Sequence, residues 1–381
     1  MYCVYNEKKD CTGCSACAQI CPKQAISMIC DNEGYYYPSI HQGLCIDCGL
    51  CKKVCGNHSP QVSAEKQRYY AAKANSDEVR IRSRSGGVFF LAAQYVIENH
   101  GVVYGAVLTH DNIVQHIRAN NIDDVQKMQG SKYVESDIRG IYSQVNDDLN
   151  KDKLVLFSGT PCQVSGLYGF LRGKHLSNLL TIDIVCHGVA SSRIFRDYIE
   201  FIENKYNGKV ASFNFRDKKY GWDQHIESFV INGVSYYKNN YTSLFYSNRS
   251  MRPSCSVCKF ARYERCSDIT LADFWGLKKS EMSDFDDNNG VSSVFINTAN
   301  GEKIFEIIKH QMKMIEVDKK MCSQPQLHSP SVVPNDRDVF WKLYDTKGFL
   351  AIMKKYGRYD LGRRLKWLLV DLPRLKSIME K

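Results

Sequence analysis

Hydrophobic and polar positions divide the chain into a short first part without long apolar runs, residues 1–56, and a long second part with alternating strand and helix patterns. Within residues 87–100, apolar side chains recur at the spacing of a helix face. Residues 101–109 and 113–119 alternate around a short polar turn, which predicts a pair of strands. The second part is therefore predicted to be an α/β structure whose first strand is residues 69–74.

The clearest unit in this part is a strand, a helix and a second strand in direct succession. Residues 153–157 predict a strand that leads to Cys162, residues 163–173 have a helical pattern, and residues 179–185 predict a strand that leads to Cys186. Strands joined through a helix run parallel, so both carboxyl ends lie at one edge of the sheet, where open α/β sheets bind ligands. The two cysteines are thus predicted to lie at a ligand-binding edge.

Cysteine usage changes this picture more than the overall composition does. The 381 residues include 16 cysteines, and nine of them lie from Cys11 to Cys55, eight of these in two regularly spaced runs. The N-terminus has no apolar stretch typical of a signal peptide, and no run of about 18 apolar residues would span a membrane. Because free thiols and metal thiolates persist in a reducing compartment, we expect a cytoplasmic protein.

Two cysteine runs of the same form occupy the first part of the chain. Each has spacings of two, two and three intervening residues: Cys11, Cys14, Cys17 and Cys21, then Cys45, Cys48, Cys51 and Cys55. Three cysteines of such a run hold one [4Fe–4S] cluster, and the fourth ligates the other cluster. The predicted ligand sets are Cys11, Cys14, Cys17 and Cys55 for one cluster, and Cys45, Cys48, Cys51 and Cys21 for the second. Zinc is the alternative, but a zinc site uses two cysteine pairs per ion rather than a duplicated run.

Five motifs in the second part occur in the same order as in a known family. They are Ser83-Arg84-Ser85-Gly86-Gly87-Val88-Phe89, Gln129-Gly130-Ser131-Lys132-Tyr133-Val134, Ser158-Gly159-Thr160-Pro161-Cys162-Gln163, Val185-Cys186-His187-Gly188, and Cys255-x2-Cys258 followed by Ser267-Asp268-Ile269-Thr270 and Ala272-Asp273-Phe274-Trp275-Gly276. To about residue 330, the chain resembles the family of beta subunits of coenzyme F420 hydrogenase and dehydrogenase, in the version fused to a two-cluster ferredoxin. The resemblance implies a bound flavin, usually FAD, a further [4Fe–4S] cluster beside it, electron transfer between clusters and flavin, and in some members hydride exchange with the deazaflavin coenzyme.

Residues of the first two motifs are candidates for binding the flavin phosphates. The first motif opens the predicted helix at 87–100, where free N–H groups and the helix dipole attract an anion. Arg82, Arg84 and Lys132 can add charge-assisted contacts to a pyrophosphate. The predicted cofactor-binding set is Arg82, Ser83, Ser85, Gly86, Gly87, Gly130, Ser131, Lys132 and Thr160. Taken alone, the first motif is better explained as a serine N-cap with two glycines in a turn, and the flavin interpretation depends on the second motif and the family pattern.

A third cluster is predicted from four cysteines of the α/β part. Cys255 and Cys258 form a Cys-x2-Cys pair, and Cys162 and Cys186 at the two strand ends would complete the set. The alternative is that the strand-end cysteines are buried small hydrophobic residues. We interpret the remaining cysteines as non-ligands, namely the bystander Cys266 and the structural residues Cys3, Cys30 and Cys322.

His187 and Asp273 are the predicted catalytic residues. His187 follows a predicted cluster ligand and can donate a hydrogen bond to sulfur or flavin, which would tune the reduction potential. Asp273 lies in residues 269–275, a predicted core strand, and can line the site together with Trp275. A satisfied structural histidine and ordinary strand packing explain these residues equally well.

The predicted domains follow from these assignments. Residues 1–60 form an α+β ferredoxin-like domain with two [4Fe–4S] clusters, residues 61–150 and 151–335 form the two parts of an α/β flavin-binding domain, and residues 336–381 form a basic amphipathic helical tail. Residues 341–381 contain eleven Lys or Arg and four Asp or Glu, so they contribute +7 of the net charge of +10. We expect the apolar face of the tail to pack on the body, with docking on an acidic membrane surface or a partner as the alternative.

Several functions are compatible with these features. The favoured one is an oxidoreductase that relays electrons between ferredoxin-type clusters and a flavin (FAD or FMN), which serves an organic substrate or a deazaflavin-like coenzyme. The alternative is a non-enzymatic electron-transfer subunit that serves a partner catalytic subunit. A zinc-stabilised binding protein is a third possibility, and nucleic-acid binding is disfavoured because the basic residues gather in the tail without a reading motif. In both redox interpretations we expect a redox partner such as a ferredoxin or another oxidoreductase subunit.

Overall fold

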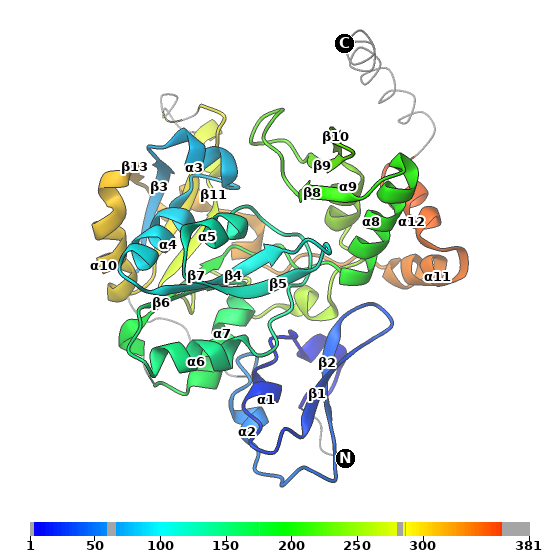
Figure 1. Ribbon diagram of the computed structural model, residues 1–381, viewed down its shortest axis with the longest axis horizontal. Helices are drawn as coiled ribbons and strands as arrows, with labels where there is room; N and C mark the ends of the chain where they lie inside the picture. Colours follow the sequence, from blue (N-terminus) through cyan, green and yellow to red (C-terminus); the bar gives the residue numbers. More distant parts are fainter. Residues whose placement is uncertain (1–3, 59–65, 175, 280–284, 286, 360–381) are drawn as a thin grey trace.

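The N-terminal segment of the computed structural model is a small α+β unit, drawn in blue in Figure 1. The structure describes residues 4–58, 66–174, 176–279, 285 and 287–359. In the first of these ranges, an antiparallel hairpin is flanked by two short helices. These elements are α1 (Ala16–Gln19), β1 (Ile26–Cys30), β2 (Tyr36–Ile40) and α2 (Leu50–Lys53). The predicted ferredoxin-like class of this unit is confirmed.

The body is built on a mixed sheet that contains eight strands within the described residues, in the order β13-β3-β12-β11-β7-β6-β4-β5. The strands are β3 (Arg68–Ala74), β4 (Val102–Leu108), β5 (Val114–Ala119), β6 (Val155–Gly159), β7 (Leu179–Ile184), β11 (Ile269–Asp273), β12 (Ser292–Ile296) and β13 (Met312–Glu316). The neighbours β4, β6, β7 and β11 run parallel, whereas β5, β12 and β13 pair antiparallel. The predicted parallel pair that carries the two strand-end cysteines is therefore confirmed as β6 and β7.

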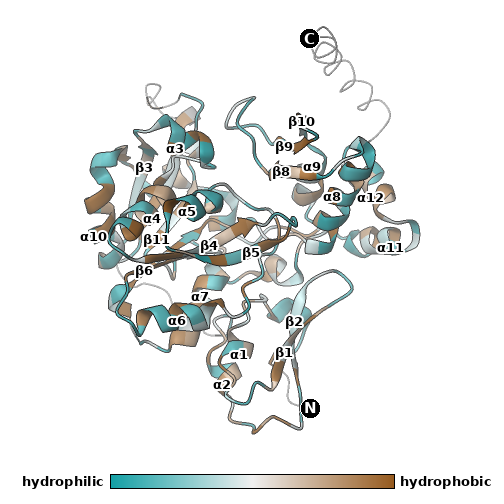
Figure 2. Cartoon of the chain, viewed as in Figure 1, coloured by the Kyte–Doolittle hydropathy of each residue, from teal (hydrophilic) through white to brown (hydrophobic). Residues whose placement is uncertain are grey.

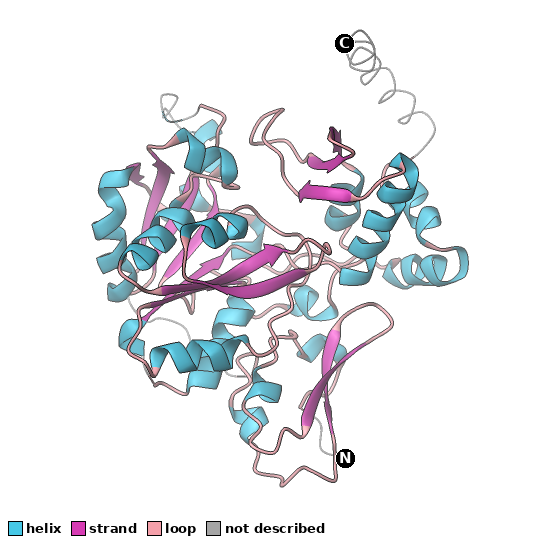
Figure 3. Ribbon diagram, in the orientation of Figure 1, coloured by secondary structure: helices cyan, strands magenta, loops and turns pink. Residues whose placement is uncertain are grey.

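Helices cover both faces of this sheet, as Figure 3 shows. On one face lie α4 (Val88–Glu98), α5 (Ile122–Met128) and α10 (Ala299–Ile308), and on the other α6 (Ile141–Leu149) and α7 (Pro161–Leu171). Successive residues of a strand point to opposite faces. Accordingly, Leu156 packs into the first core, while Val155 and Phe157 on the same strand pack into the second. The inner strands of the sheet are buried on both sides, which explains their continuous apolar runs, brown in Figure 2.

A third unit lies beside the sheet and was not foreseen in the sequence. It consists of α8 (Ser192–Tyr206), β8 (Val210–Asn214), β9 (Glu227–Ile231), β10 (Val234–Lys238), α9 (Asn240–Tyr246), α11 (Arg337–Lys347) and α12 (Phe349–Tyr356). The three strands form a separate antiparallel sheet in the order β10-β9-β8 within the described residues. Aromatic side chains dominate its core, among them Phe195, Tyr198 and Phe229.

The first part of the predicted tail belongs to this third unit. Ile352 and Met353 of α12 are fully buried in its core, together with Phe340 and Trp341 of α11. The expectation that the apolar face packs on the body holds for these helices, whereas residues 360–381 lie outside the described residues. Across the described part of the chain, no helix has the length and apolar character needed to cross a membrane.

The shorter elements complete the fold. The α-helix α3 (Asp77–Arg82) precedes the first predicted phosphate motif, and η3 (Pro253–Val257) carries the first cysteine of the Cys-x2-Cys pair. The remaining 3-10 turns are η1 (Lys8–Asp10), η2 (Leu176–Asn178), η4 (Trp275–Lys279), η6 (Lys309–Gln311), η7 (Lys319–Cys322) and η8 (Pro325–Leu327).

Candidate iron–sulfur centres and adjoining site

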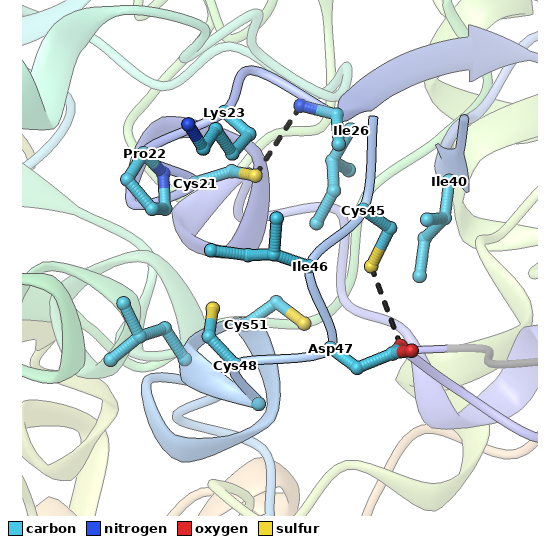
Figure 4. A pocket seen from close by; sticks show the side chains of 13 residues that line it. Cys21, Pro22, Lys23, Ile26, Ile40, Cys45, Ile46, Asp47, Cys48 and Cys51 are labelled. Atoms are coloured by element: carbon cyan, nitrogen blue, oxygen red, sulfur yellow. Dashed lines mark hydrogen bonds between the residues drawn. The ribbon is translucent and has the colours of Figure 1, made fainter. Parts of the chain in front are cut away.

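The outermost candidate site is a pocket that contains four sulfur atoms (Figure 4). Its cysteine residues are Cys21, Cys45, Cys48 and Cys51. Cys21 comes from the first cysteine run and the other three from the second, as the ligand-exchange rule predicts. The Ala25 backbone N–H donates to the sulfur of Cys21 at 3.3 Å, and such hydrogen bonds are one means of tuning a cluster potential. Apolar side chains, including Ile26 and Ile46, line much of the rest of the pocket, together with Lys23 and Asp47.

The second candidate site joins Cys55 to the first run. Burial raises the pKa of the thiols of Cys11, Cys14 and Cys17, to about 12 for Cys14, and the nearby Cys55 contributes to the rise in each case. All four sulfurs therefore lie within electrostatic range of one another. A buried thiolate needs compensating positive charge, which the iron atoms of a cluster would supply. The donor set thus fits a four-cysteine cluster.

The third candidate site lies at the carboxyl edge of the sheet. Cys162 occupies the start of α7 directly after β6, Cys186 follows β7, and Cys255 and Cys258 come from η3 and the residue after it. All four line one pocket. Burial raises the pKa of Cys162 and Cys255 to about 12, and neighbouring cysteines of the set add to both shifts. The four cysteines predicted for a third cluster are thus brought together from three separate segments.

The other cysteines lie elsewhere. Cys266 is buried in the core between α7 and the sheet, where its Sγ lies 3.4 Å from the carbonyl oxygen of Pro161, and it does not line the pocket. Cys322 is buried in a different core cluster, which fits a structural role. Cys30 is exposed on β1, and Cys3 lies outside the described residues.

The three sites follow one another in space. Cys51 of the outermost site is close enough to add to the raised pKa of Cys17, and Cys162 of the third site does the same for Cys14, with burial the larger cause in both. Helix α1 packs against α7. The loop before α1 also approaches α7 closely at Gly166, where an added Cβ would lie 2.9 Å from the sulfur of Cys14. This close contact places the second site between the other two.

The two predicted phosphate motifs are also neighbours. The Gln129 side chain donates to the hydroxyl of Ser83 at 2.8 Å, which holds the loop after α5 against the loop between α3 and α4. However, Ser85 and Gly86 are hydrogen-bonded to strand β12 and the residue before it: the Ser85 hydroxyl donates to the carbonyl of Val291 and the Gly86 N–H to the hydroxyl of Ser292. Ser85 and Gly86, which the sequence predicts to bind a flavin phosphate, therefore anchor this loop to the sheet.

The remaining predicted cofactor residues take varied positions. The Lys132 ammonium lies 2.9–3.2 Å from the backbone carbonyls of residues 127–130, so it caps the end of α5, and burial lowers its pKa to about 7. Arg82 is exposed and donates to Gln126. Thr160 caps α7, and its hydroxyl lies 3.1 Å from the sulfur of Cys162, so it belongs to the third cysteine site. Gly130 and Ser131 are half-buried in the loop beside Arg82.

The two predicted catalytic residues lie on opposite sides of a polar and aromatic cluster. His187 lines the third pocket, and its Nε2 is 2.8 Å from the side-chain oxygen of Asn248. Burial lowers the pKa of His187. Asp273, at the end of β11, accepts from the guanidinium of Arg84 at 2.7 Å and from the indole of Trp222 at 3.4 Å.

Between them lie residues that the sequence did not single out. Arg216 is buried and donates to the hydroxyls of Tyr133 and Tyr246 and to the backbone carbonyl of Trp222. The ring of Tyr246 in turn lies 5.1 Å from that of His187. Trp222 and Trp275 stack at 4.8 Å beside Asp273, with Trp222 buried and Trp275 half-buried. These residues are dispersed in the sequence, and no motif marks them.

Two further residues border both the second and the third sites. Arg252 lines the third pocket together with Glu135, and its side chain reaches Cys11 of the second. Burial raises the pKa of Glu135 to about 7, although the positive charge of Arg252 opposes the rise. In the sequence, only position marks these two residues as candidates for the site. Arg252 lies three residues before Cys255, and Glu135 directly follows the second motif.

Comparisons with known proteins identify two segments of the chain. Residues 152–320 match the family described as the C terminus of the beta subunit of coenzyme F420 hydrogenase/dehydrogenase, and residues 10–58 match the 4Fe-4S dicluster domain. The chain is 20% identical over 330 residues to the subunit designated F of the F(420)H(2) dehydrogenase of Methanosarcina mazei, and the match covers 81% of this chain and 85% of the relative.

A solved structure was also found. One polypeptide of the F420-reducing [NiFe] hydrogenase complex from Methanosarcina barkeri, determined with xenon derivatization, is 14% identical, with a TM-score of 0.47 over 73% of this chain and 92% of that chain. The first matched segment, residues 10–58, contains the dicluster unit, and the second, residues 152–320, contains all four cysteines of the third site. Residues 152–320 therefore match the C-terminal part of coenzyme F420 hydrogenase/dehydrogenase beta subunits, and residues 10–58 match a 4Fe–4S dicluster domain, which makes the chain an iron–sulfur electron-transfer protein.

Proposed function

We propose that this protein relays electrons along three [4Fe–4S] clusters to a flavin, which exchanges electrons or hydride with an organic substrate or a deazaflavin-like coenzyme. The observation that carries the proposal is the succession of three four-cysteine sites, each close enough to the next to influence the pKa of its thiols. One-electron carriers work in series only when they lie close together. The outermost site, which includes the exposed Cys48, is where we expect electrons to enter or leave.

The ligand assignment is part of this proposal. The outermost cluster would be held by Cys21, Cys45, Cys48 and Cys51, the second by Cys11, Cys14, Cys17 and Cys55, and the third by Cys162, Cys186, Cys255 and Cys258. When bound, the clusters supply one-electron oxidation and reduction. The protein contributes burial, backbone N–H groups aimed at sulfur, and the buried Arg252 beside the second site.

The flavin assignment is supported by the two neighbouring loops and by the aromatic cluster near Asp273. A flavin, FAD or FMN, converts between single electrons from clusters and electron pairs for an organic substrate. We expect its phosphates at the loop of residues 83–87 and its ring between the third cysteine site and the pair of Trp222 and Trp275. Asp273 and Arg84 would then border the flavin, and His187 would lie between flavin and cluster.

The substrate and partner are proposed from the family and the named relative. The family is described by coenzyme F420 hydrogenase and dehydrogenase, and the relative is part of an F420H2 dehydrogenase, so a deazaflavin coenzyme is the first substrate to test. Both descriptions are of subunits, which favours a redox partner such as another oxidoreductase subunit or a ferredoxin.

A second function has one specific observation in its favour. Lys132 caps a helix, and Ser85 and Gly86 bind the sheet, so several predicted phosphate ligands already have partners. If these groups keep their present partners, the chain binds no flavin and passes electrons directly to a catalytic partner subunit.

The test is a metal and flavin analysis of anaerobically purified protein with two matched variants. From the ligand count, the wild type should contain about twelve irons, twelve sulfides and one flavin per chain. Cys162→Ser should reduce the iron to about eight, while Cys266→Ser, a buried cysteine outside the pocket, should leave it unchanged. About eight irons and no flavin in the wild type would reject the full relay and leave the function of a transfer subunit.

A further inference from the structure

Arg252 is a charged side chain in the interior of the protein. It is fully buried, with 0% of its surface exposed. A buried guanidinium is costly unless hydrogen-bonded acceptors and an opposite charge surround it. Its Nη1 donates to a carboxylate oxygen of Glu135 at 2.5 Å, and its Nε and Nη2 donate to the carbonyls of Cys11 and Tyr36 at 2.9 and 2.8 Å. Its charge also lies over the ring of Tyr37 at 4.4 Å.

These contacts join two predicted cluster sites. The Arg252 backbone belongs to the body, where its N–H donates to the carbonyl of Val189 and its own carbonyl accepts from the N–H of Cys255. Its side chain lies in the dicluster unit, where Nη2 is 3.8 Å from the sulfur of Cys11. The fit is tight, because a Cβ on Gly13 would be 2.5 Å from Glu135 and 2.7 Å from Arg252. One side chain thus links a ligand loop of the third site to a ligand of the second.

A fixed charge at this position must act on the reduction equilibrium. Reducing a [4Fe–4S] cluster adds one electron and one negative charge, with no bond made or broken. A cation beside a ligand sulfur stabilises the reduced form more than the oxidised form, and a buried site screens this effect less than water would. A carboxylate at a similar distance destabilises the reduced form and so lowers the reduction potential.

We propose that Arg252 raises the reduction potential of the cluster held by Cys11, Cys14, Cys17 and Cys55, and that Glu135 limits this rise. The pair would then set the reduction potential of the second cluster. Arg252 is a tuning and positioning residue in this scheme, because it touches a ligand rather than a substrate. The inference depends on the dicluster assignment and requires neither the third cluster nor the flavin of the proposed function.

The alternative is a purely mechanical clamp between the dicluster unit and the body. A clamp predicts that removing either partner loosens the interface and changes the potential in the same direction. Charge tuning predicts opposite directions, since Arg252→Gln removes a positive charge and Glu135→Gln removes a negative one. Arg252→Lys keeps the positive charge but loses the planar guanidinium group and its fixed arrangement of hydrogen-bond donors.

The experiment is an anaerobic reductive titration of the full-length protein with dithionite at pH 8.5, followed by electron paramagnetic resonance. Iron is measured on the same samples, so that loss of a cluster is separated from a change in its potential. Arg68→Gln serves as the matched control, because its partners Glu302 and Glu316 lie far from any ligand in the sequence and line neither pocket.

We expect Arg252→Gln to lower the reduced-to-oxidised ratio of one cluster about tenfold at a given potential, which corresponds to 59 mV for one electron. Glu135→Gln should raise the same ratio, and Arg252→Lys should stay near the wild type. Shifts of the same sign in the two Gln variants, or shifts no larger than in Arg68→Gln, would overturn the proposal. If Arg252→Gln does not fold, Glu135→Gln decides alone: an unchanged or lowered potential would overturn it.

Discussion

In the predicted flavin loop, residues 83–87, Gly86 has no room for a side chain. A Cβ added at Gly86 would lie 2.1 Å from the carbonyl oxygen of Ala72 and 2.8 Å from the backbone nitrogen of Ser292. Both are backbone atoms of sheet strands, which cannot rotate away as a flexible side chain can. Replacing Gly86 by alanine must therefore push the loop away from the sheet.

The cost can be worked out from the contacts that this movement breaks. The Gly86 N–H donates to the Ser292 hydroxyl at 2.9 Å, and the Gly86 carbonyl accepts from the Ala74 N–H at 2.7 Å. Each hydrogen bond contributes about 1 kcal/mol, and overpacking at a rigid site costs about 1–3 kcal/mol. We expect Gly86→Ala to lower the free energy of unfolding by about 4 kcal/mol.

The assay is urea denaturation under anaerobic conditions, followed by far-ultraviolet circular dichroism. Gly140→Ala is the matched control: Gly140 has φ +78°, and among the described residues no atom beyond its chain neighbours lies within 4 Å of the added Cβ. It should cost only the strain of the left-handed backbone, about 1 kcal/mol. Extracted flavin should fall in Gly86→Ala and not in Gly140→Ala, if the loop holds the flavin phosphates. Equal unfolding free energies for the two variants would refute the steric argument.

Three further predictions concern parts of the fold that support the site. Arg80 depresses the pKa of Asp287 through a hydrogen bond, so Asp287→Asn should lower stability by about 1 kcal/mol at pH 7 after allowing for solvent screening, and this difference should shrink progressively in acid titrations as the pH falls below the ordinary aspartate pKa of 3.8. Burial lowers the pKa of His116 to about 4, so the unfolded state takes up its proton first and stability falls as the pH decreases from 6.5 to 4. His116→Gln should remove that part of the fall in denaturation curves, and an unchanged pH profile would contradict the assignment. Ile352→Ala should cost about 3 kcal/mol in the same assay and the exposed Leu350→Ala less than about 1 kcal/mol, whereas similar losses would mean that α12 does not anchor the third unit.

Local patterns predicted most of the elements that surround the site. The helical spacing within residues 87–100 corresponds to α4, and the alternating residues 101–109 and 113–119 correspond to β4 and β5. These predictions succeeded because burial on one face, or on both, imposes a period on the sequence itself. The aromatic third unit was missed because its strands are short and its core is assembled from α8, β9 and α12, which are distant in sequence.

The predicted roles of individual site residues were harder to derive. Lys132 has the residue type of a phosphate ligand, yet it caps α5, and Ser85 bonds to the residue that precedes β12. Arg252 and Glu135 have no motif, yet they meet between two cysteine sites. A residue type states which bonds a side chain can make, but the neighbours that compete for those bonds come from other segments.

The sequence by itself determined the cysteine chemistry of the N-terminal unit, because ligand spacing within a short loop leaves few ways to surround a cluster. It also indicated that Cys162 and Cys186 would share a sheet edge, since parallel strands joined by a helix end on the same side. The sequence also predicted that the Cys255 pair joins them and Cys266 does not, and the tertiary structure brings these four cysteines into one pocket that Cys266 does not line. The tertiary structure alone placed the second cysteine site between the other two and buried Arg252 there, because these contacts depend on how separately folded segments pack against each other.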